Sequence, residues 1–195
     1  LTSRWGGAGA QSVNTQGGNI SVVNISATSL TSRWAAFSGN VSSTINLTSG
    51  LASVFSWTWF PSAGGRVCLS TGANFNFATP GILGNGSAIN QAWSFNTAAD
   101  NATNTYNVTY SAVMGVCNLT VGGTWANGTV AVALGGSSSY KNCAINDGVN
   151  TSKANFAFCT NISSSGTDFS GKTAHYELMV PTGTTETYNF FMEPN

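Results

Sequence analysis

The chain has 195 residues, of which 42% are hydrophobic and only 6% are charged, and its formal net charge is zero. A chain of this length suits one large β domain or two small ones, and its apolar fraction is sufficient for a packed core. With six Lys and Arg against six Asp and Glu, the protein lacks the charge excess that attracts nucleic acid or acidic lipid over a distance. Ser, Thr, Asn and Gly must therefore form most of its surface.

The first residues differ in composition from the rest of the chain. Residues 1–16 are rich in Gly, Ser, Ala and Gln and precede the pair Gly17–Gly18. The chain starts at Leu1, and we expect that a signal peptide has been removed. We predict an extended N-terminal arm at 1–16 and one domain at 17–195. No membrane span is expected, because no apolar run approaches about 18 residues.

Five residues of this arm recur in the domain. The sequence LTSRW stands at Leu1–Trp5 and again at Leu30–Trp34. A narrow vocabulary of Leu, Thr and Ser can account for the repeat, but we favour the use of one strand geometry twice. An arm that resembles a strand of the domain can pair with a sheet edge of a neighbouring subunit.

Short runs of β-branched and aromatic residues follow along the chain, separated by Gly, Asn, Ser or Pro. The alternation slips within the first run, which indicates a bulge or a strand with two apolar faces. Residues 85–100 are the least strand-like and are expected to hold one short helix or a long loop. The pattern predicts an all-β chain, an antiparallel β-sandwich of immunoglobulin-like or jelly-roll-like type. Strands are expected at 19–26, 33–47, 52–60, 66–70, 104–121, 128–134, 155–162, 175–180 and 186–193.

The acceptor pattern for N-linked glycans, Asn-x-Ser/Thr, occurs eleven times, about twice as often as the composition predicts. Glycans are added during export and need an accessible position. We therefore predict an extracellular glycoprotein, the alternative being accidental matches in a chain rich in Ser, Thr and Asn. The predicted sites are Asn19, Asn24, Asn40, Asn46, Asn85, Asn101, Asn107, Asn118, Asn127, Asn150 and Asn161.

The chain has four cysteines, at Cys68, Cys117, Cys143 and Cys159. None forms a C-x-x-C pair and there is one histidine, so a zinc site is not expected. An even number of cysteines in an exported chain indicates two disulfides, for which three pairings are possible. We favour Cys68–Cys117 and Cys143–Cys159, because the second pair flanks two adjacent strand-like runs and can staple a hairpin.

Catalytic patterns are absent from the sequence. His175 is the only histidine, and although Asp168 and Glu177 lie near it along the chain, there is no G-x-S-x-G motif. Two facing carboxylates would be enough for a glycosidase, but nothing in the sequence brings two of the six together. No calcium-binding loop is present either. We predict a protein that is not an enzyme and binds no cofactor or metal.

Several segments resemble a group of archaeal secreted surface proteins. The series GGNISVVNIS, TSRWAAFSGNVSSTINL, FSWTW and GRVCLS is followed later by NFAFC, DFSGKTAHYELMVP and TETYNFFME, and spans roughly 17–193. Its most specific parts are the block from Trp34 to Gly39–Ser42 and the last aromatic strand. The resemblance implies an N-glycosylated β-sandwich at the cell surface. More loosely, the low charge, many glycan acceptors and N-terminal arm are similar to archaeal thread-like pilins, in which the N-terminal strand of one subunit completes the next.

These features predict a structural subunit of an extracellular glycosylated filament. The arm 1–16 of one subunit would complete a sheet of the next by strand addition. We expect Leu1, Trp5 and Val13 of the arm to contact the neighbour. Head-to-tail contacts of this kind do not close and therefore form fibres. The partners would be identical subunits and covalent N-glycans, with no nucleic acid.

The alternative function is a monomeric cell-surface adhesin or glycan-binding module. Trp57 and Trp59 are two residues apart and share one face of a predicted strand. Such a pair can stack on sugar rings, although we favour a core position because a sandwich of this size needs large inward residues. In the adhesin, these two residues or Trp93 would be exposed.

Overall fold

The structure is a computed structural model and describes only part of the chain. The described residues are 2–3, 10–15, 18–24, 26–29, 33–41, 43–49, 52–78, 80, 86–104, 113–121, 124–133, 140–149, 151–168, 171–183 and 186–194. They form mostly β-strands with short helical turns, and each strand pairing among them is antiparallel. The all-β prediction is confirmed at this level.

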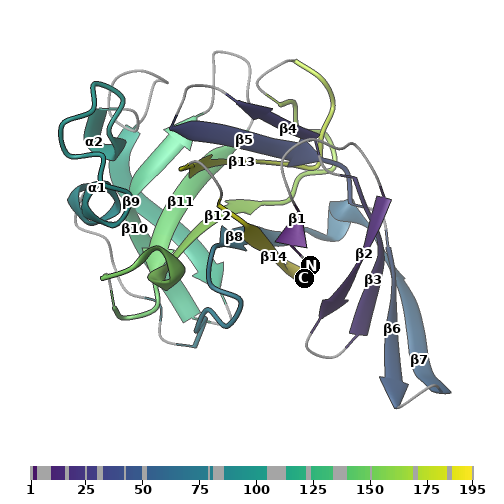
Figure 1. The fold of residues 1–195 in the computed structure, drawn as a ribbon. Coiled ribbons are helices and arrows are strands. Elements are labelled where there is room, and N and C mark those ends of the chain that lie inside the picture. The colour runs from purple at the N-terminus through teal and green to yellow at the C-terminus, as the bar shows by residue number, and fades with distance from the viewer. Residues whose placement is uncertain are drawn as a thin grey trace.

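The largest sheet has seven strands in the order β1-β14-β8-β12-β11-β10-β9 (Figure 1). The first and last strands of the chain, β1 and β14, are neighbours at one of its edges. The strands of this sheet are β1 (Thr2–Ser3), β8 (Gly65–Ser70), β9 (Val113–Val121), β10 (Thr124–Ala133), β11 (Lys141–Asn146), β12 (Phe156–Asn161) and β14 (Tyr188–Pro194).

Two smaller sheets complete the described fold. A three-stranded sheet has the order β13-β5-β4, and a four-stranded sheet has the order β2-β3-β6-β7. In Figure 1 the four-stranded sheet extends to the lower right, away from the seven-stranded sheet. Their strands are β2 (Ala10–Thr15), β3 (Gly18–Asn24), β4 (Ser26–Ser29), β5 (Trp34–Gly39), β6 (Ser43–Ser49), β7 (Ala52–Trp59) and β13 (Tyr176–Pro181).

Two runs that we predicted as single strands each supply two sheets. The run 19–26 contributes to β3 and β4, and the run 33–47 contributes to β5 and β6. β3 pairs with β6 in the four-stranded sheet, whereas β4 pairs with β5 in the three-stranded sheet. The slip in the apolar pattern of the first run falls inside β3, where the β2–β3 register is irregular between the pairs Gln11–Val23 and Val13–Ile20. The bulge that we expected there is confirmed.

The main hydrophobic core lies between the seven-stranded and the three-stranded sheets. Trp34 on β5, Phe158 on β12 and Leu178 on β13 are all fully buried in it. A smaller cluster contains Cys68, whose neighbours Val67 and Leu69 belong to the main core. Because successive strand residues point to opposite faces, the smaller cluster occupies the other face of the seven-stranded sheet.

The region 85–100 contains a short helix, as one of the two sequence expectations proposed. This helix, α1 (Ser87–Ala92), is followed by the buried rings of Trp93 and Phe95, and α2 (Ala102–Asn104) comes shortly after. The 3-10 turns are η1 (Pro61–Ala63) and η3 (Lys153–Asn155). Within the described ranges, no helix has the length and apolar character that crossing a membrane requires.

The free side of β13 is occupied by a side chain from the neighbouring sheet. Asn142 on β11 is fully buried, and its Oδ1 accepts a hydrogen bond from the backbone N–H of Met179 at 2.8 Å. Its Nδ2 donates to the backbone oxygen of Glu177 at 3.4 Å. The amide thus satisfies backbone groups that an additional strand would otherwise take up.

Candidate functional site

The candidate site is the edge of the seven-stranded sheet formed by β14. On one side, β14 pairs with β8 from Asn189 to Pro194. On the other side, the two-residue strand β1 pairs with it, with Thr2 opposite Asn189 and Ser3 opposite Tyr188. Among the described strands, none pairs with this side of 190–194. The edge of a sheet is a place where another strand can pair through backbone N–H and C=O groups.

The side chains of β14 hold this edge in place from both faces of the sheet. The Phe190 ring lies 5.8 Å from that of Phe37 and 6.4 Å from that of Tyr176, both in the main core. On the opposite face, the ring of Phe191 lies 5.0 Å from that of Phe77. The edge is therefore a preformed surface, which is a favourable property for adding a strand.

Further contacts anchor the two ends of β14. At its start, the Tyr188 hydroxyl donates to the backbone oxygen of Pro181, and Asn189 Nδ2 donates to the Ser70 oxygen at 3.3 Å. At its end, Glu193 forms an ion pair of 2.9 Å with Arg66. These contacts do not involve β1, so β14 keeps its anchors whether or not β1 is bound.

The predicted contact residues of the arm are only partly described. Leu1 and Trp5 lie outside the described residues. Val13 lies on β2, where it is opposite Ile20 of β3. The β2–β3 register runs from Ala10 to Thr15, so the second half of the predicted arm is paired within its own chain.

The second copy of LTSRW anchors the segment that follows α1. Trp34 Nε1 donates to the backbone oxygen of Asp100 at 2.6 Å, and Arg33 forms an ion pair with the Asp100 carboxylate at 2.9 Å. The Trp34 ring also packs edge-on against Phe95 with centroids 5.9 Å apart. In this copy the Arg-Trp pair thus has a structural role.

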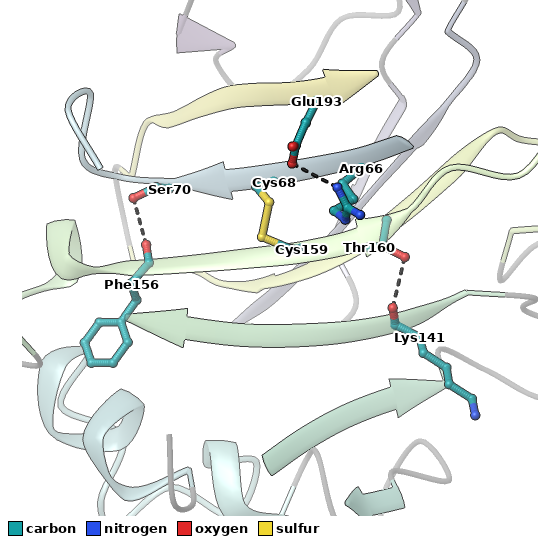
Figure 2. The surroundings of a disulfide bond; sticks show 8 residues. All are labelled: Arg66, Cys68, Ser70, Lys141, Phe156, Cys159, Thr160 and Glu193. Atoms are coloured by element: carbon teal, nitrogen blue, oxygen red, sulfur yellow. Dashed lines mark hydrogen bonds and ion pairs between the residues drawn. A yellow bond between two sulfur atoms is a disulfide. The ribbon is translucent and has the colours of Figure 1, made fainter. Parts of the chain in front are cut away.

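The disulfide of the described residues joins Cys68 to Cys159 (Figure 2). Our preferred pairings, Cys68–Cys117 and Cys143–Cys159, are therefore wrong. The physical reason is the strand register, which places Cys68 on β8 directly opposite Cys159 on β12, with 4.1 Å between their Cα atoms. A sequence separation of 91 residues hides this proximity.

Cys143 lies opposite Cys159 on the other side of β12. The hairpin β11–β12 therefore aligns the two cysteines that we expected to be bonded, but Cys159 is already used by Cys68. Cys143 is itself disulfide-bonded. Because the chain has four cysteines, the expected partner of Cys143 is Cys117, which belongs to β9.

Hydroxyl groups on both sides of the disulfide connect β12 with its two neighbours, β8 and β11 (Figure 2). Ser70 Oγ on β8 donates to the backbone oxygen of Phe156 on β12 at 2.7 Å. Thr160 Oγ1 on β12 donates to the backbone oxygen of Lys141 on β11 at 2.9 Å. The centre of the seven-stranded sheet is thus tied together by a covalent bond and by side-chain hydrogen bonds.

The predicted glycan acceptors are placed in several kinds of position. Asn40 and Asn161 are exposed, and Asn101 is half-buried. Two pairs face each other across neighbouring strands: Asn19 is opposite Asn46, and Asn118 is opposite Asn127. Asn24 lies in β3, while Asn85, Asn107 and Asn150 lie outside the described residues.

His175 binds backbone atoms. Its Nδ1 lies 3.0 Å from both the nitrogen and the oxygen of Val41, so the ring supports the turn after β5. The Asp168 carboxylate accepts hydrogen bonds from Ser38 Oγ and from the backbone N–H of Lys172, each at 3.0 Å. These contacts give His175 and Asp168 structural roles.

Tyr140 lies in a buried polar region with two carboxylates. Its hydroxyl donates to the backbone oxygen of Ala174. Burial raises the pKa of Tyr140 to about 12, and the nearby Glu177 and Asp168 act in the same direction against a lowering hydrogen bond with Ser163. Asp168 is only 6% exposed and Glu177 is fully buried, so a polymeric substrate cannot reach either carboxylate in this structure.

We expect the stability of the protein to fall between pH 10 and pH 12. Below pH 10, Tyr140 is neutral in both the folded and the unfolded chain. Between its ordinary pKa and about 12, the unfolded chain releases the proton and the folded chain does not, so the unfolding free energy falls by up to about 1.4 kcal/mol per pH unit. Burial raises the pKa of Tyr176 as well, which adds to the effect. Urea unfolding at pH 8, 10 and 11 measures it.

The Tyr140→Phe variant is the control for this prediction. It should be less stable than the parent at pH 8, because the Ala174 oxygen loses its donor, and its stability should fall less steeply above pH 10. An equal pH dependence in the two proteins would contradict the assignment to Tyr140.

Trp93 is a core residue, which removes it from the candidate sugar-stacking residues. It is 6% exposed and packs against Phe156 and Phe158 at centroid distances of 5.8 and 5.9 Å. Trp57 and Trp59 lie on β7, opposite Ile45 and Ser43 of β6. Within the described residues, no group of three His, Cys, Asp or Glu side chains is arranged to hold a metal ion.

No protein-family model, curated protein or solved structure matches this chain.

Proposed function

We propose that this protein is a structural subunit of an extracellular, N-glycosylated filament, with a β-sandwich domain that assembles head-to-tail by strand addition. The observation that carries the proposal is the pairing of β1 with the edge strand β14. Among the described residues, Thr2 and Ser3 of the N-terminal segment pair with the outer side of β14, and β8 pairs with its inner side. Strand addition at such an edge provides main-chain hydrogen bonds for affinity and alternate side-chain positions for specificity.

The character of the edge also supports assembly. Phe190, Phe191 and Met192 on β14 are each half-buried, and aromatic and Met side chains are enriched in protein interfaces. An exposed apolar strand edge is an aggregation hazard unless it is covered. Glu193 and Pro194 are the last two residues of β14. Because a charged residue and a proline disfavour the addition of a strand at a sheet edge, an added strand would pair with the central part of β14.

The rest of the chain fits an extracellular structural role. The Cys68–Cys159 disulfide links the centre of the seven-stranded sheet, and disulfides persist in oxidising compartments. Glycans on the exposed Asn40 and Asn161 would limit contact between neighbouring filaments. The resemblance to archaeal surface proteins and thread-like pilins agrees with this proposal.

Deletion of residues 1–9 tests the proposal. We expect electron microscopy to show filaments for the complete chain and only single particles for the shortened chain. The described contact that this deletion removes is the pairing of Thr2 and Ser3 with β14, which contributes about 1 kcal/mol, so we expect a fall in melting temperature of no more than about 4 °C. This deletion leaves β2 in its hairpin with β3, whereas deletion of 1–16 would remove a paired strand.

Two single substitutions accompany the deletion, the first as a second test of β1 and the second as a control. Thr2→Pro removes a backbone N–H from β1 and keeps the chain length, so it should reduce filament formation. Val149→Ala changes a residue that is 49% exposed and lies between β11 and η3, outside the strands, and it should leave filaments unchanged. Normal filaments from the shortened chain would exclude donation by the N-terminal segment.

The adhesin or glycan-binding module remains the second candidate function, because Trp57 and Trp59 lie in the four-stranded sheet that extends away from the seven-stranded one (Figure 1). Under this function the protein is monomeric, and Trp57→Ala weakens binding to an oligosaccharide array. Filaments together with no glycan binding would exclude it.

A further inference from the structure

We infer that the glycan on Asn161 docks on its own chain, on the face of the seven-stranded sheet that carries the described disulfide. The docking surface is formed by Arg66, Glu193 and Phe191, and its ligand is the first sugars of that glycan, of the neutral pyranose class. This inference rests on the N-glycosylation in the proposed function and specifies what one of the glycans binds.

The strand register places Arg66 beside Asn161 on this face. Cys68 on β8 and Cys159 on β12 are directly opposite each other and joined through their side chains. Arg66 and Asn161 form the pair two residues farther along the same two strands. Side chains two residues apart on a strand point to the same face, and directly opposite residues have Cβ atoms about 4.5–5.5 Å apart. A sugar on the exposed Asn161 therefore starts next to Arg66.

The same row of residues continues to the edge strand. Glu193 on β14 is opposite Arg66, and their side chains form the ion pair drawn in Figure 2. Neighbouring strands lie about 4.7–4.9 Å apart, so the row from β12 to β14 spans about 10 Å. Two pyranose rings in sequence cover this distance, which brings the glycan on Asn161 within reach of both charged side chains.

The ion pair supplies hydrogen-bonding groups for sugar hydroxyls. Arg66 Nη1 donates to Glu193 Oε2 at 2.9 Å, and a guanidinium carries five N–H donors. Among the described residues, the buried Arg66 Nε has no hydrogen-bond partner, which disfavours the present position of the guanidinium. A rotation toward Asn161 would let a sugar hydroxyl accept from it. The Glu193 side chain is 39% exposed and can accept from another hydroxyl.

An apolar surface lies next to the ion pair. Phe191 precedes Glu193 by two residues on β14 and therefore lies on the same face. The Phe191 ring lies 5.0 Å from that of Phe77, which lies 4.7 Å from the ring of the buried Phe75. Phe191 and Phe77 are half-buried, so part of each ring is accessible. Sites for small molecules combine aromatic rings with a few polar groups that fix the orientation of the ligand.

The attachment through Asn161 explains why a surface of this small size would be occupied. A tethered ligand is present at a high effective concentration, so contacts too few to bind a free sugar are sufficient. Asn40, in contrast, lies between β5 and β6, and none of the described strand pairings includes it. We therefore expect a docked glycan at Asn161 and a free one at Asn40.

Periodate oxidation of the complete glycosylated chain tests the inference. Periodate cleaves the vicinal diols of sugars, and a docked sugar reacts only in the molecules in which it is transiently free. Mass spectrometry of glycopeptides gives the rate at each site, which is divided by the rate for the same glycopeptide isolated after proteolysis. We expect this ratio to be about tenfold lower at Asn161 than at Asn40, as for a sugar that is docked in about 90% of the molecules. Single particles are separated from filaments before the reaction, so that neighbouring subunits do not protect the glycan.

Three substitutions locate the protection on the inferred surface. Phe191→Ala removes the aromatic ring and should raise the ratio at Asn161 about tenfold. Phe191→Leu keeps an apolar side chain in the packing without a planar ring, and it should raise the ratio even where the alanine variant fails to fold. Phe60→Ala is the matched control, because it removes a ring that is 62% exposed and lies outside the seven-stranded sheet, and it should leave the ratio unchanged.

The outcomes separate this inference from the proposed function. An unoccupied Asn161, a rate there equal to that of the isolated glycopeptide, or protection that both Phe191 variants leave unchanged would each overturn the docking. Electron microscopy of the same preparation shows independently whether filaments form. Filaments with a freely reacting glycan at Asn161 overturn the docking and leave filament assembly standing. Single particles alone, with a protected glycan, support the docking and overturn the filament.

Discussion

The double variant Cys68→Ala, Cys159→Ala should lose about 4 kcal/mol of unfolding free energy. The disulfide joins residues separated by 91 positions, and a cross-link over such a length restricts the unfolded chain strongly. Both sulfur atoms also belong to a buried cluster with Phe75 and Ile145, so their removal leaves space in the packing. For a chain of this size the loss corresponds to a fall in melting temperature of about 8–16 °C.

Equilibrium unfolding in guanidinium chloride under oxidising conditions measures this effect. The Val149→Ala variant serves as the surface control and should unfold at the same denaturant concentration as the parent. Reduction of the parent protein should lower stability beyond the double variant, because Cys143 is disulfide-bonded as well. An unchanged stability of the double variant would show that the Cys68–Cys159 bond is not present in the folded protein.

The single variant Cys68→Ala should behave differently. It leaves Cys159 unpaired, with Cys143 directly opposite on β11. We expect the Cys159 thiol to attack the disulfide of Cys143 in some molecules, which forms a Cys143–Cys159 bond and releases Cys117 as a thiol, and peptide mapping would detect the exchange. Because the exchange leaves the number of disulfides unchanged, the stability of this variant should not exceed that of the double variant.

The second large effect is expected at Trp34. Trp34→Ala removes a fully buried indole from the main core and should cost about 3–5 kcal/mol. It also removes the hydrogen bond from Nε1 to the Asp100 oxygen and the ring contact with Phe95. Trp34→Phe retains part of the ring volume and loses the hydrogen bond, so it should cost about 1–3 kcal/mol.

Trp5 stands at the equivalent place in the other LTSRW copy and makes a matched comparison. Under the proposed function, Trp5→Ala should reduce filament formation with little change in the melting temperature. Thermal unfolding and electron microscopy of Trp34→Ala and Trp5→Ala measure the two effects separately, namely the loss of fold stability expected at Trp34 and the loss of filaments expected at Trp5. A stability loss at Trp5 equal to that at Trp34 would contradict this division.

The sequence predicted the positions of strands where a run of alternating apolar and polar residues is bounded by turn-forming residues. The runs 66–70, 155–162 and 186–193 correspond to β8, β12 and β14. β11 was missed because its sequence, KNCAIN, includes polar residues that are nevertheless buried, among them Asn142 and Asn146. Asn142 is buried because it bonds to the backbone of β13, a reason that no local pattern contains.

The candidate site was harder to predict than the strands. The sequence led us to expect that the N-terminal arm adds to a sheet of a neighbouring subunit, and it did not indicate the pairing of Thr2 and Ser3 with β14 of their own chain. β1 and β14 lie at opposite ends of the sequence, and only the strand order makes them neighbours. The same limitation explains the wrong disulfide pairing, because the register of β8 and β12 depends on contacts far apart in the chain.

The Asn142 side chain also bears on how an assembly of this chain would grow. It occupies the side of β13 that faces away from β5, whereas on the outer side of β14 the described residues that pair are Thr2 and Ser3 of β1. Strands would then add at β14 without a matching addition at β13. The two ends of a growing polymer would then differ, because one end would offer the edge of β14 and the other end would offer an N-terminal strand. Elongation should therefore be faster at one end than at the other.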